Sequence, residues 1–328
     1  MIIKGNNGNN LLKGTSSSDI IYGYGGDDTL YGYSSNDTLY GGNNDDLLYG
    51  GTGNDKIYGE AGSDILYGES GDDILNGGTG IDYMFGGTGN DKYYVDRITD
   101  TVYENANEGI DTVISTVSYA LSENIEKLTL TGYNSINGRG NYLNNQINGN
   151  DGSNILRGEG GNDAIWGHNG NDKIYDYDGS TEAYGGNGND VIEVSSWLSD
   201  NILCGDDGND TIYSYDANSN EISGGRGNDY ITTGWGSTDT YHFSKWDGTD
   251  RIADYYGDDS IDFSSGFVRN NLKFAKTGSY NEDLQITFNN STDKIVVENW
   301  FYGSDYQIET LDFTNGTQIT AAEINSHF

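Results

Sequence analysis

The chain has 328 residues but no proline, one cysteine and only 16 basic residues against 52 acidic ones. A single cysteine, Cys204, excludes an internal disulfide. The formal charge of −36 excludes nucleic acid as a natural partner and disfavours electrostatic binding to anionic membranes. No apolar run approaches a membrane span, and the start, MIIKGNNGNNLLKG, lacks the apolar core of a secretory signal peptide. Hydrophobic residues make up only 34% of the chain, so a stable fold has to need few of them.

Glycine, in contrast, is abundant, with 50 residues, and much of it is periodic. It occupies every ninth position from Gly5 to Gly86. Five residues after nine of these ten glycines comes an aspartate, and two residues later an apolar side chain. Such regularity indicates a repeat architecture. The periodic apolar residues are Leu12, Ile21, Leu30, Leu39, Leu48, Ile57, Leu66, Leu75, Met84 and Tyr93.

The nine-residue spacing predicts a coil with two short strands in each turn. A strand such as 56–58 points its middle residue, Ile57, to one face and its neighbours to the other. Glycine-rich residues between strands allow tight turns, because positive φ costs little only for glycine or asparagine. Eighteen residues then bring the chain back above itself, with stacked strands roughly 4.7–4.9 Å apart. Asp55 and Asp73 are therefore expected about 5 Å apart, as neighbours in a ladder of aspartates.

This ladder predicts a bound divalent cation. Two like charges about 5 Å apart repel by roughly 0.8 kcal/mol in water, and by about four times more at an effective dielectric of about 20. Calcium binds oxygen at roughly 2.3–2.6 Å, so one ion fits between two such carboxylates, and carbonyls of the glycine loops can complete its coordination. Magnesium, smaller and strictly octahedral, suits the site less well. The plain alternative, hydrogen-bonded turn aspartates, is disfavoured by nine copies in register with no lysine or arginine opposite them.

The stretch GGTGNDKIYGEAGSDILYGESGDDILNGGTGIDYMFGGTGND carries the pattern GGxGxDxUx, and in this it resembles the RTX (haemolysin-type) calcium-binding repeats. The resemblance implies an all-β fold, a parallel β-roll (a right-handed β-helix or solenoid) of nonapeptide repeats in two blocks with a small β-rich C-terminal cap. It also implies Ca²⁺ as cofactor, with about ten ions. The ligands expected in the first block are Asp19, Asp28, Asp37, Asp46, Gly50, Thr52, Asp55, Gly59, Ala61, Asp64, Gly68, Ser70, Asp73, Gly77, Thr79, Asp82, Gly86, Thr88 and Asp91.

The period divides the chain into four parts. We expect a first calcium roll at 1–95, a connecting insert of extended coils at 96–137, a second roll at 138–265, and a cap with a secretion signal at 266–328. In the first roll, Ser17, Ser35 and Asn44 replace the second glycine of the loop and Asn10 replaces the aspartate, so weaker or missing calcium is expected there.

In the second roll only alternate loops keep the motif. Thr181 interrupts it, and residues 194–204 and 214–223 lack the loop altogether. This alternation predicts calcium mainly on one side of the second roll, with the opposite side closed by longer turns without ions. The ligands expected in this block are Asn154, Asp163, Gly167, Asn169, Asp172, Gly185, Asn187, Asp190, Gly205, Asp207, Asp210, Gly224, Arg226 and Asp229.

An aromatic residue closes most repeats of the first roll and should face outward. The resulting stripes could stiffen the sheet through cross-strand packing or bind sugar rings on a partner surface. Catalysis finds little support, because the three histidines lack an HExxH context and neither a GxSxG elbow nor a GK[ST] loop is present. Cys204 is expected to be partly buried and inert. The candidate surface or glycan-binding residues are Tyr31, Tyr40, Tyr49, Tyr58 and Tyr67.

The resemblance implies a secreted, extracellular bacterial protein, exported by type 1 secretion machinery, that folds on calcium outside the cell. We expect a structural or interaction module, adhesin-like or carbohydrate-binding, that is not an enzyme. Its partners would be calcium, the secretion machinery and an extracellular polysaccharide or cell surface, without nucleic acid or a transmembrane segment. Alternatives are the C-terminal region of a larger secreted enzyme or toxin, an R-module like those of mannuronan epimerases, or a membrane-active protein like a small rhizobial nodulation protein.

Overall fold

The computed structural model describes residues 1–289 and 291–328 and contains two compact units, Met1–Asn148 and Gly149–Phe328. Both units consist of short strands stacked in parallel ladders, and one short α-helix, α1 (Ala321–Asn325), is the only one in the described ranges. The predicted all-β parallel solenoid is confirmed. Among the described residues, no helix is long and apolar enough to cross a membrane.

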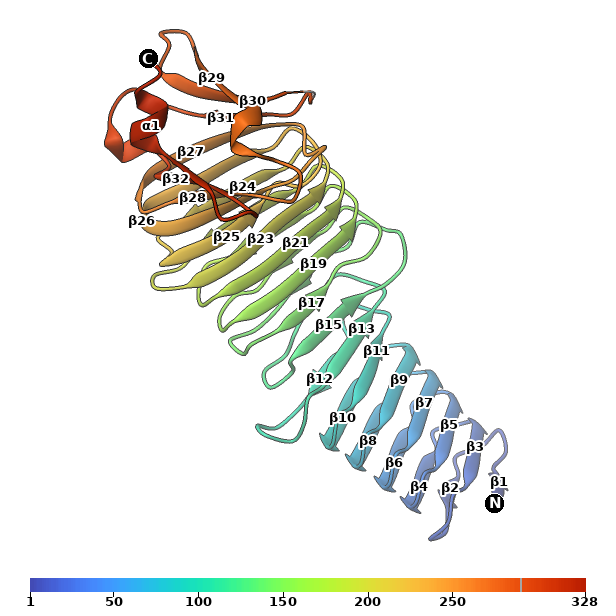
Figure 1. Cartoon of the computed structure of the whole chain (residues 1–328). Helices are drawn as coiled ribbons and strands as arrows, with labels where there is room; N and C mark the ends of the chain where they lie inside the picture. The colour runs from blue at the N-terminus through green and yellow to red at the C-terminus, as the bar shows by residue number, and fades with distance from the viewer. Residues whose placement is uncertain (290) are drawn as a thin grey trace. The chain divides into compact units, whose positions relative to one another are not determined.

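The first unit coils through two parallel sheets, which run side by side in the blue part of the ribbon (Figure 1). The two-residue strands β14 (Tyr119–Ala120) and β16 (Gly138–Arg139) form a further pair. One sheet contains β2 (Leu11–Lys13), β4 (Thr29–Ser34), β6 (Leu47–Thr52), β8 (Ile65–Ser70), β10 (Tyr83–Thr88) and β12 (Thr101–Tyr103). The other contains β1 (Ile2–Lys4), β3 (Ile20–Gly25), β5 (Thr38–Asn43), β7 (Lys56–Ala61), β9 (Ile74–Thr79), β11 (Lys92–Val95), β13 (Thr112–Ser115), β15 (Lys127–Leu130) and β17 (Gln146–Asn148).

The register of these sheets follows from the nine-residue period. In β7, Ile57 pairs with Leu39 of β5 and with Leu75 of β9, so each coil takes 18 residues. The periodic apolar side chains stack above one another inside the coil, and those from Ile21 to Tyr93 are 0% exposed. One apolar residue per strand therefore suffices for a core, which explains how a chain this polar can fold.

The turns need positive φ, and this is why glycine recurs in them. Gly51 has φ +112°, and a Cβ there would lie 2.2 Å from the carbonyl oxygen of Tyr33 in the preceding coil. Two of the three residues that replace the second loop glycine keep this conformation, since Ser35 has φ +73° and Asn44 has φ +78°, whereas Ser17 does not have positive φ. The loops of Ser35 and Asn44 therefore retain the turn, which costs a non-glycine residue backbone strain.

After Val95 the coils continue with irregular lengths. Tyr93 of β11 pairs with Val113 of β13, which is 20 residues later, whereas Val113 pairs with Leu128 of β15 after only 15. Strand β12 still pairs with β10. Strands β12, β13 and β15 of this irregular stretch thus add to the same two sheets, whereas β14 pairs with β16.

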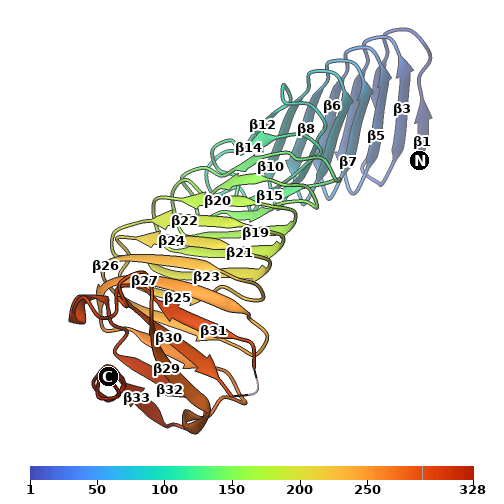
Figure 2. The same cartoon turned by 90° about the horizontal axis from the view of Figure 1, so that it is seen from above.

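The second unit also has two parallel sheets, which lie beside each other in Figure 2. Strand β26 (Tyr230–Phe243) is long enough to contribute to both: Ile231 pairs with Ile212 of one sheet and Tyr241 with Ile222 of the other. One sheet begins with β18 (Ile155–Arg157), β20 (Lys173–Asp176), β22 (Val191–Ser195) and β24 (Thr211–Tyr215), and after β26 continues with β27 (Thr249–Gly257). The other contains β19 (Asp163–Asn169), β21 (Thr181–Asn187), β23 (Asp200–Asp207), β25 (Ser219–Ser223), β26 and β28 (Ser260–Phe263).

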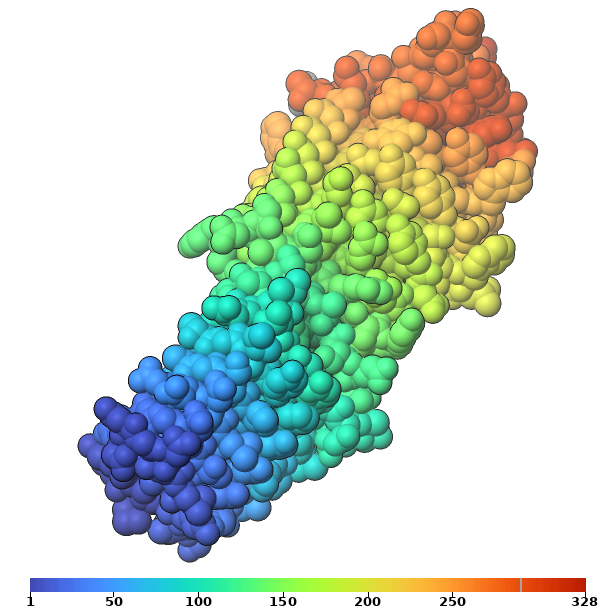
Figure 3. All heavy atoms as spheres, turned by 180° about the vertical axis from the view of Figure 1, so that it is seen from behind, coloured from blue at the N-terminus to red at the C-terminus, as the bar shows by residue number. Residues whose placement is uncertain are grey.

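The last residues close the end of this unit, where orange and red atoms cover the yellow coils (Figure 3). Strands β31 (Lys294–Val297) and β32 (Thr310–Phe313) extend the two sheets in parallel from β27 and β28. The order then becomes antiparallel: β30 (Asp283–Phe288) pairs with β31 and β29 (Leu272–Thr277) with β30, while β33 (Gln318–Thr320) pairs with β32. Trp300 is 0% exposed and its indole N–H donates to Asn325 of α1 at 2.8 Å. Two 3₁₀ turns, Arg269–Asn271 and Ser304–Tyr306, complete the cap.

Candidate metal sites

The repeat aspartates of the first unit are buried and joined in a ladder. Each lies at the turn before a strand and is at most 3% exposed. One carboxylate oxygen, Oδ1, accepts the backbone N–H of the aspartate 18 residues earlier, as when Asp55 N–H donates to Asp73 at 2.7 Å and Asp64 N–H to Asp82 at 2.9 Å. The side chain of each repeat thus fixes the turn of the coil before it.

The second carboxylate oxygen, Oδ2, takes no part in this hydrogen-bonded ladder. Within the part of the chain that the structure describes, it is buried and has no hydrogen-bond partner. A buried carboxylate oxygen without a partner is costly, so a row of them indicates ligands for a cation. The aspartates with this arrangement are Asp28, Asp37, Asp46, Asp55, Asp64, Asp73, Asp82 and Asp91 in the first unit, and Asp172, Asp190, Asp210 and Asp229 in the second.

Nine of these twelve free oxygens face a backbone carbonyl across a small gap beside a repeat glycine. A Cβ added to Gly59 would lie 2.3 Å from Asp64 Oδ2 and 2.6 Å from the carbonyl oxygen of Gly77. Carboxylate and carbonyl oxygens are the ligands that calcium prefers, and its flexible coordination suits a site shared between two coils. The residues present therefore fit calcium. The same pairing of oxygens occurs beside Gly23, Gly32, Gly41, Gly50, Gly68, Gly167, Gly185 and Gly205.

The third residue of each predicted loop is exposed or half-buried, unlike the buried aspartates. Asn187 donates to Asn169 at 2.7 Å, and Arg226 lies 3.8 Å from Asp207, both on the surface. These residues could reach an ion only through their backbone carbonyls. The same is true of Thr52, Ala61, Ser70, Thr79 and Thr88.

Burial changes the charge of the ladder when no cation is bound. It raises the pKa of Asp46, Asp55 and Asp64 to about 7 and that of Asp73 to about 8, and neighbouring carboxylates add to the shift. At neutral pH these carboxyls are therefore only partly ionised without a cation, and a positive charge beside them favours their charged form.

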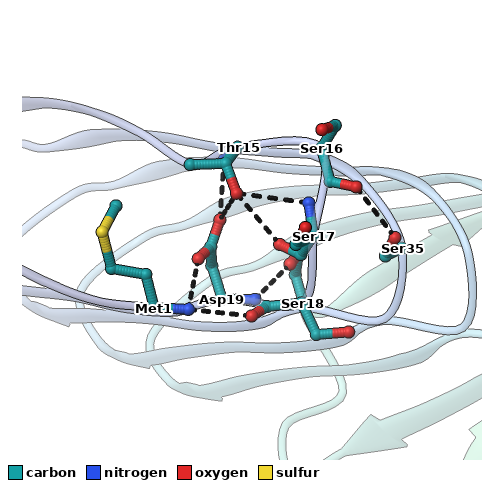
Figure 4. A network of polar contacts seen from close by, with 8 residues as sticks. Met1, Thr15, Ser16, Ser17, Ser18, Asp19 and Ser35 are labelled. Carbon is teal, nitrogen blue, oxygen red and sulfur yellow. Dashed lines mark hydrogen bonds and ion pairs between the residues drawn. The ribbon is translucent and has the colours of Figure 1, made fainter.

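At the first coil the carboxylate of Asp19 contacts the N-terminal ammonium group. The N-terminal ammonium of Met1 lies 2.5 Å from Asp19, and Thr15 donates to the same side chain from both its backbone N–H and its hydroxyl (Figure 4). These contacts hold the pKa of Asp19 below its usual range. In the loop before it, Asn10 accepts the backbone N–H of Asn6 in place of an aspartate.

In the second unit the aspartate ladder continues along one side. Backbone N–H groups join Asn154 to Asp172 and Asp172 to Asp190, both at 2.7 Å, and the ladder ends with Asp229 donating to Asp250 at 3.0 Å. A Cβ added to Gly224 would lie 2.4 Å from Asp229 Oδ2. Asp163, the one expected ligand of the other side, is 2% exposed and lies beside Gly158.

Amides replace carboxylates on that other side. Asn201 accepts the backbone N–H of Thr181 at 3.0 Å and donates to Asn220 at 3.0 Å, and Asn220 donates to Asp239 at 2.6 Å. Both asparagines are 2% exposed. Because an amide both donates and accepts, this ladder satisfies itself without a cation. Calcium mainly on one side of the second block remains a prediction, and this arrangement supports it.

Several acidic residues that the sequence pattern did not single out also lie in the ladders. Asp100 and Asp111 accept the backbone N–H groups of Asp82 and Asp91. Asp100 could have been found, because it keeps the nine-residue spacing, whereas Asp111 and Asp250 follow coils of 20 and 21 residues. Two clusters bring three carboxylates within 4.8 Å: Asp91, Glu104 and Asp111, and Asp239, Asp254 and Asp259.

The tyrosine stripes are present, one on each sheet of the first unit. Tyr31 and Tyr49 stack at 4.8 Å between ring centroids, and Tyr49 and Tyr67 at 4.9 Å. On the other sheet, Tyr40 and Tyr58 stack at 5.0 Å. All five rings are half-buried, and their faces cover one another.

Comparisons with known proteins agree with this geometry. The family described as RTX calcium-binding nonapeptide repeat matches residues 4–39, 40–75, 67–102, 139–174, 175–196, 198–218 and 216–237. The haemolysin-type calcium binding protein related domain matches residues 283–323, within the cap. A crystal structure similar to the chain is that of a hyperactive, Ca²⁺-dependent, β-helical antifreeze protein from an Antarctic bacterium. The two are 17% identical over 96% of this chain and 94% of that one, with a TM-score of 0.38.

No curated protein matches the sequence at a significant level. The repeat family, however, covers more than half of the chain, and the buried carboxylate ladder lies within the matched residues. The expected cofactor, Ca²⁺, is therefore confirmed. The chain belongs to the RTX family of calcium-binding nonapeptide repeat proteins.

Proposed function

We propose that this chain is exported unfolded by type 1 secretion and folds outside the cell when calcium enters its loops. The observation that carries the proposal is the buried carboxylate ladder, whose second oxygens have no partner among the described residues. Where calcium is scarce, repulsion along the ladder opposes coiling. Where calcium is plentiful, each ion joins two coils, so binding free energy becomes folding free energy.

Calcium titration of chelator-stripped protein, followed by far-UV circular dichroism, tests this mechanism. We expect a cooperative transition from coil to β structure with calcium and none with magnesium at the same concentration, because the loops suit larger, flexible coordination. A chain that already has its full β signal in chelator at neutral pH would contradict both the charge-ladder argument and export in an unfolded state.

For the folded protein we propose a structural or interaction role outside the cell, adhesin-like, without catalysis in these residues. Repeat solenoids present extended surfaces that suit interaction with a partner. A longer reading frame with an effector domain would instead make this region the calcium-binding and secretion part of a secreted enzyme or toxin, including a mannuronan-epimerase-like one.

Carbohydrate binding is a second candidate, and the second unit offers the surface for it. Aromatic side chains lie at the same end of successive strands of the second unit, and we call this group the aromatic corner. Among them Trp197 is 81% exposed and Trp235 is 73% exposed. Trp235 lies 4.8 Å from Tyr256 at a tilt of 36°, so part of its face stays open, unlike the stacked tyrosines of the first unit. The aromatic corner consists of Tyr177, Trp197, Tyr215, Trp235 and Tyr256.

Charge selects the class of carbohydrate. The chain carries −36, and Glu193 accepts a hydrogen bond from Tyr177 at 3.3 Å within the corner itself. Acidic polysaccharides would be repelled there, so we propose a neutral one, held by stacking of its rings on exposed aromatic faces.

Affinity electrophoresis in calcium, with neutral and acidic polysaccharides in the gel, tests this candidate. We expect Trp197→Ala and Trp235→Ala to abolish retardation by a neutral polysaccharide and Tyr58→Ala with Tyr67→Ala to leave it unchanged. Loss with the tyrosine variants only would move the site to the first unit. Equal mobility in every gel would refute carbohydrate binding while leaving the calcium mechanism intact.

A further inference from the structure

The first block ends at an acidic cluster in which Asp91 belongs to the nine-residue pattern of aspartates, whereas Glu104 and Asp111 do not. Carboxylate oxygens of Asp91, Glu104 and Asp111 all lie within 4.8 Å of one another. Asp91 is 0% exposed and Asp111 is 1% exposed, whereas Glu104 is half-buried. Three carboxylates so close and so shielded from water repel one another unless a positive charge joins them.

Two oxygens of the cluster are available as ligands. Within residues 1–289 and 291–328, Asp91 Oδ2 and Glu104 Oε2 are buried and have no hydrogen-bond partner. Oxygens that share one calcium ion can lie up to about twice the calcium–oxygen distance of roughly 2.3–2.6 Å apart, and the three carboxylates have oxygens within 4.8 Å of one another. An ion between the carboxylates would therefore contact all three.

Glu104 stands where the repeat would have a glycine, 18 residues after Gly86. In the regular coils, a Cβ on Gly68 would lie 2.6 Å from the carbonyl oxygen of Gly86. Here, a Cβ on Gly86 would lie 2.5 Å from Glu104 Oε1 and 2.2 Å from Asp91 Oδ2. A charged carboxylate thus takes the place of a neutral carbonyl.

The fold holds Glu104 in this position from several directions. Strand β12 pairs with β10 and ends at Tyr103, so Glu104 directly follows a fixed strand. The hydroxyl of Tyr93 donates to Glu104 Oε1. Tyr93 is 0% exposed and belongs to the residues stacked inside the coil. The side chain of Asn124 donates to the Glu104 backbone carbonyl at 3.0 Å.

We propose that Asp91, Glu104 and Asp111 bind one calcium ion more tightly than the repeat loops do, and that this ion fixes the end of the first block. Calcium affinity rises with the number of charged ligands, and this site has three carboxylates where a repeat site pairs carboxylate with carbonyl oxygens. The ion would order the segment 96–111 against the coil that precedes it. The site depends on the calcium binding of the repeats and not on export or on any surface ligand.

The test uses the full chain, stripped of calcium. Isothermal titration with calcium measures affinity, and hydrogen exchange with mass spectrometry reports protection of residues 96–111 at each calcium level. Glu104→Gln keeps the shape and removes one charge. We expect the tightest phase of the titration to weaken roughly ten- to a hundredfold. Protection of 96–111 should then need correspondingly more calcium. Glu123→Gln, the same change at an exposed position of the first unit, should behave as wild type.

Matching titrations and matching exchange for Glu104→Gln and Glu123→Gln would overturn the proposal. The wild-type chain gives a second test that does not depend on a variant folding. With about one equivalent of calcium per chain, 96–111 should become protected before residues 41–60, since the tightest site fills first. Protection of 41–60 first would refute this site alone, because the chain would still fold with calcium.

Discussion

At the scale of the residue, the two oxygens of each repeat aspartate have different tasks. In Asp64, Oδ1 accepts the backbone N–H of Asp46 at 2.8 Å, whereas Oδ2 faces the carbonyl oxygen of Gly77 beside Gly59. The first contact sets the geometry of the turn, and asparagine could make it equally well. Only the second oxygen requires a carboxylate, because an amide nitrogen there would repel a cation.

Asp64→Asn separates these two tasks. The ladder bond to Asp46 should survive, while one calcium ligand and one charge are lost. We expect fewer calcium ions bound and a midpoint of the calcium titration several-fold higher, measured by isothermal titration and circular dichroism. Asp45→Asn is the matched control, because Asp45 is exposed and uses one oxygen to accept the N–H of Ser63 at 2.8 Å. Equal shifts for both variants would show that net charge, and not ligation, governs the transition.

Gly59→Ala probes the gap itself. The new methyl group would lie 2.3 Å from Asp64 Oδ2 and would occupy the space between the two coils. We expect the loss of calcium at this position and a lower melting temperature in calcium. The loss in the free energy of unfolding should match that of an overpacked core, about 1–3 kcal/mol. Gly303→Ala is the control, since Gly303 has φ 168° and nothing within 4 Å of a Cβ. A variant of Gly59 that binds and melts as wild type would place the ion elsewhere.

At the scale of the element, the second unit shows two ways to stack coils. One side has a ladder of aspartates, whose negative charge favours a bound cation. The other side has Asn201 and Asn220, whose side-chain amides hydrogen-bond to each other. The longer turns on that side, such as 194–200, no longer need the glycine loop. Calcium dependence should therefore reside in one edge of this unit.

Asn220→Asp tests the amide ladder. The change removes the donor to Asp239 and sets two carboxylates at hydrogen-bond distance in a site that is 2% exposed. We expect a loss of about 2–4 kcal/mol in the free energy of unfolding, measured by denaturant titration in saturating calcium. Asn315→Asp is the control, because Asn315 acts as an acceptor for Thr317 and aspartate can do the same. If Asn220→Asp were as stable as the wild type in saturating calcium, this side of the unit would also bind ions.

The sequence predicted the regular coils well, because one period sets the strands, the turns and the 18-residue register at once. Ile57 and Asp55 lie where the spacing placed them, inside the coil and in the ladder. Glu104 could not be found this way. Its position keeps the 18-residue register, but its role depends on a glutamate side chain that lies where regular coils have a glycine carbonyl. That role also depends on the coil of 20 residues that brings Asp111 beside Asp91. The exposure of the tyrosine ring faces could not be predicted from the sequence either, because the stacking of Tyr40 on Tyr58 depends on how neighbouring coils align.

At the scale of the whole molecule, protons and calcium compete for the same ladder. In the calcium-free chain the carboxyls of Asp46, Asp55 and Asp91 have a pKa of about 7, against 3.8 in water. The folded form therefore binds more protons than the unfolded form between about pH 4 and pH 7. The free energy of unfolding without calcium should fall as pH rises through this window.

Circular dichroism in chelator checks this dependence. We expect partial β structure near pH 5 and its loss near pH 8. With calcium the sign reverses: protons compete for the carboxylates, so the calcium concentration at the midpoint should fall as pH rises. A calcium-free spectrum that does not change between these two pH values would mean that the ladder carries no protons, against the burial of its carboxylates.

The size of the whole chain in solution gives the last test, and it bears directly on export. An unfolded chain of 328 residues should have a radius of gyration of about 65 Å. Charge repulsion from 52 acidic residues keeps the calcium-free chain near that value at neutral pH, and a chain in this state can pass through a narrow channel. Small-angle scattering should show a large decrease in this radius when calcium is added and little change with magnesium. A compact calcium-free chain at neutral pH would leave calcium as a ligand of a protein already folded, and export would then require another means of unfolding it.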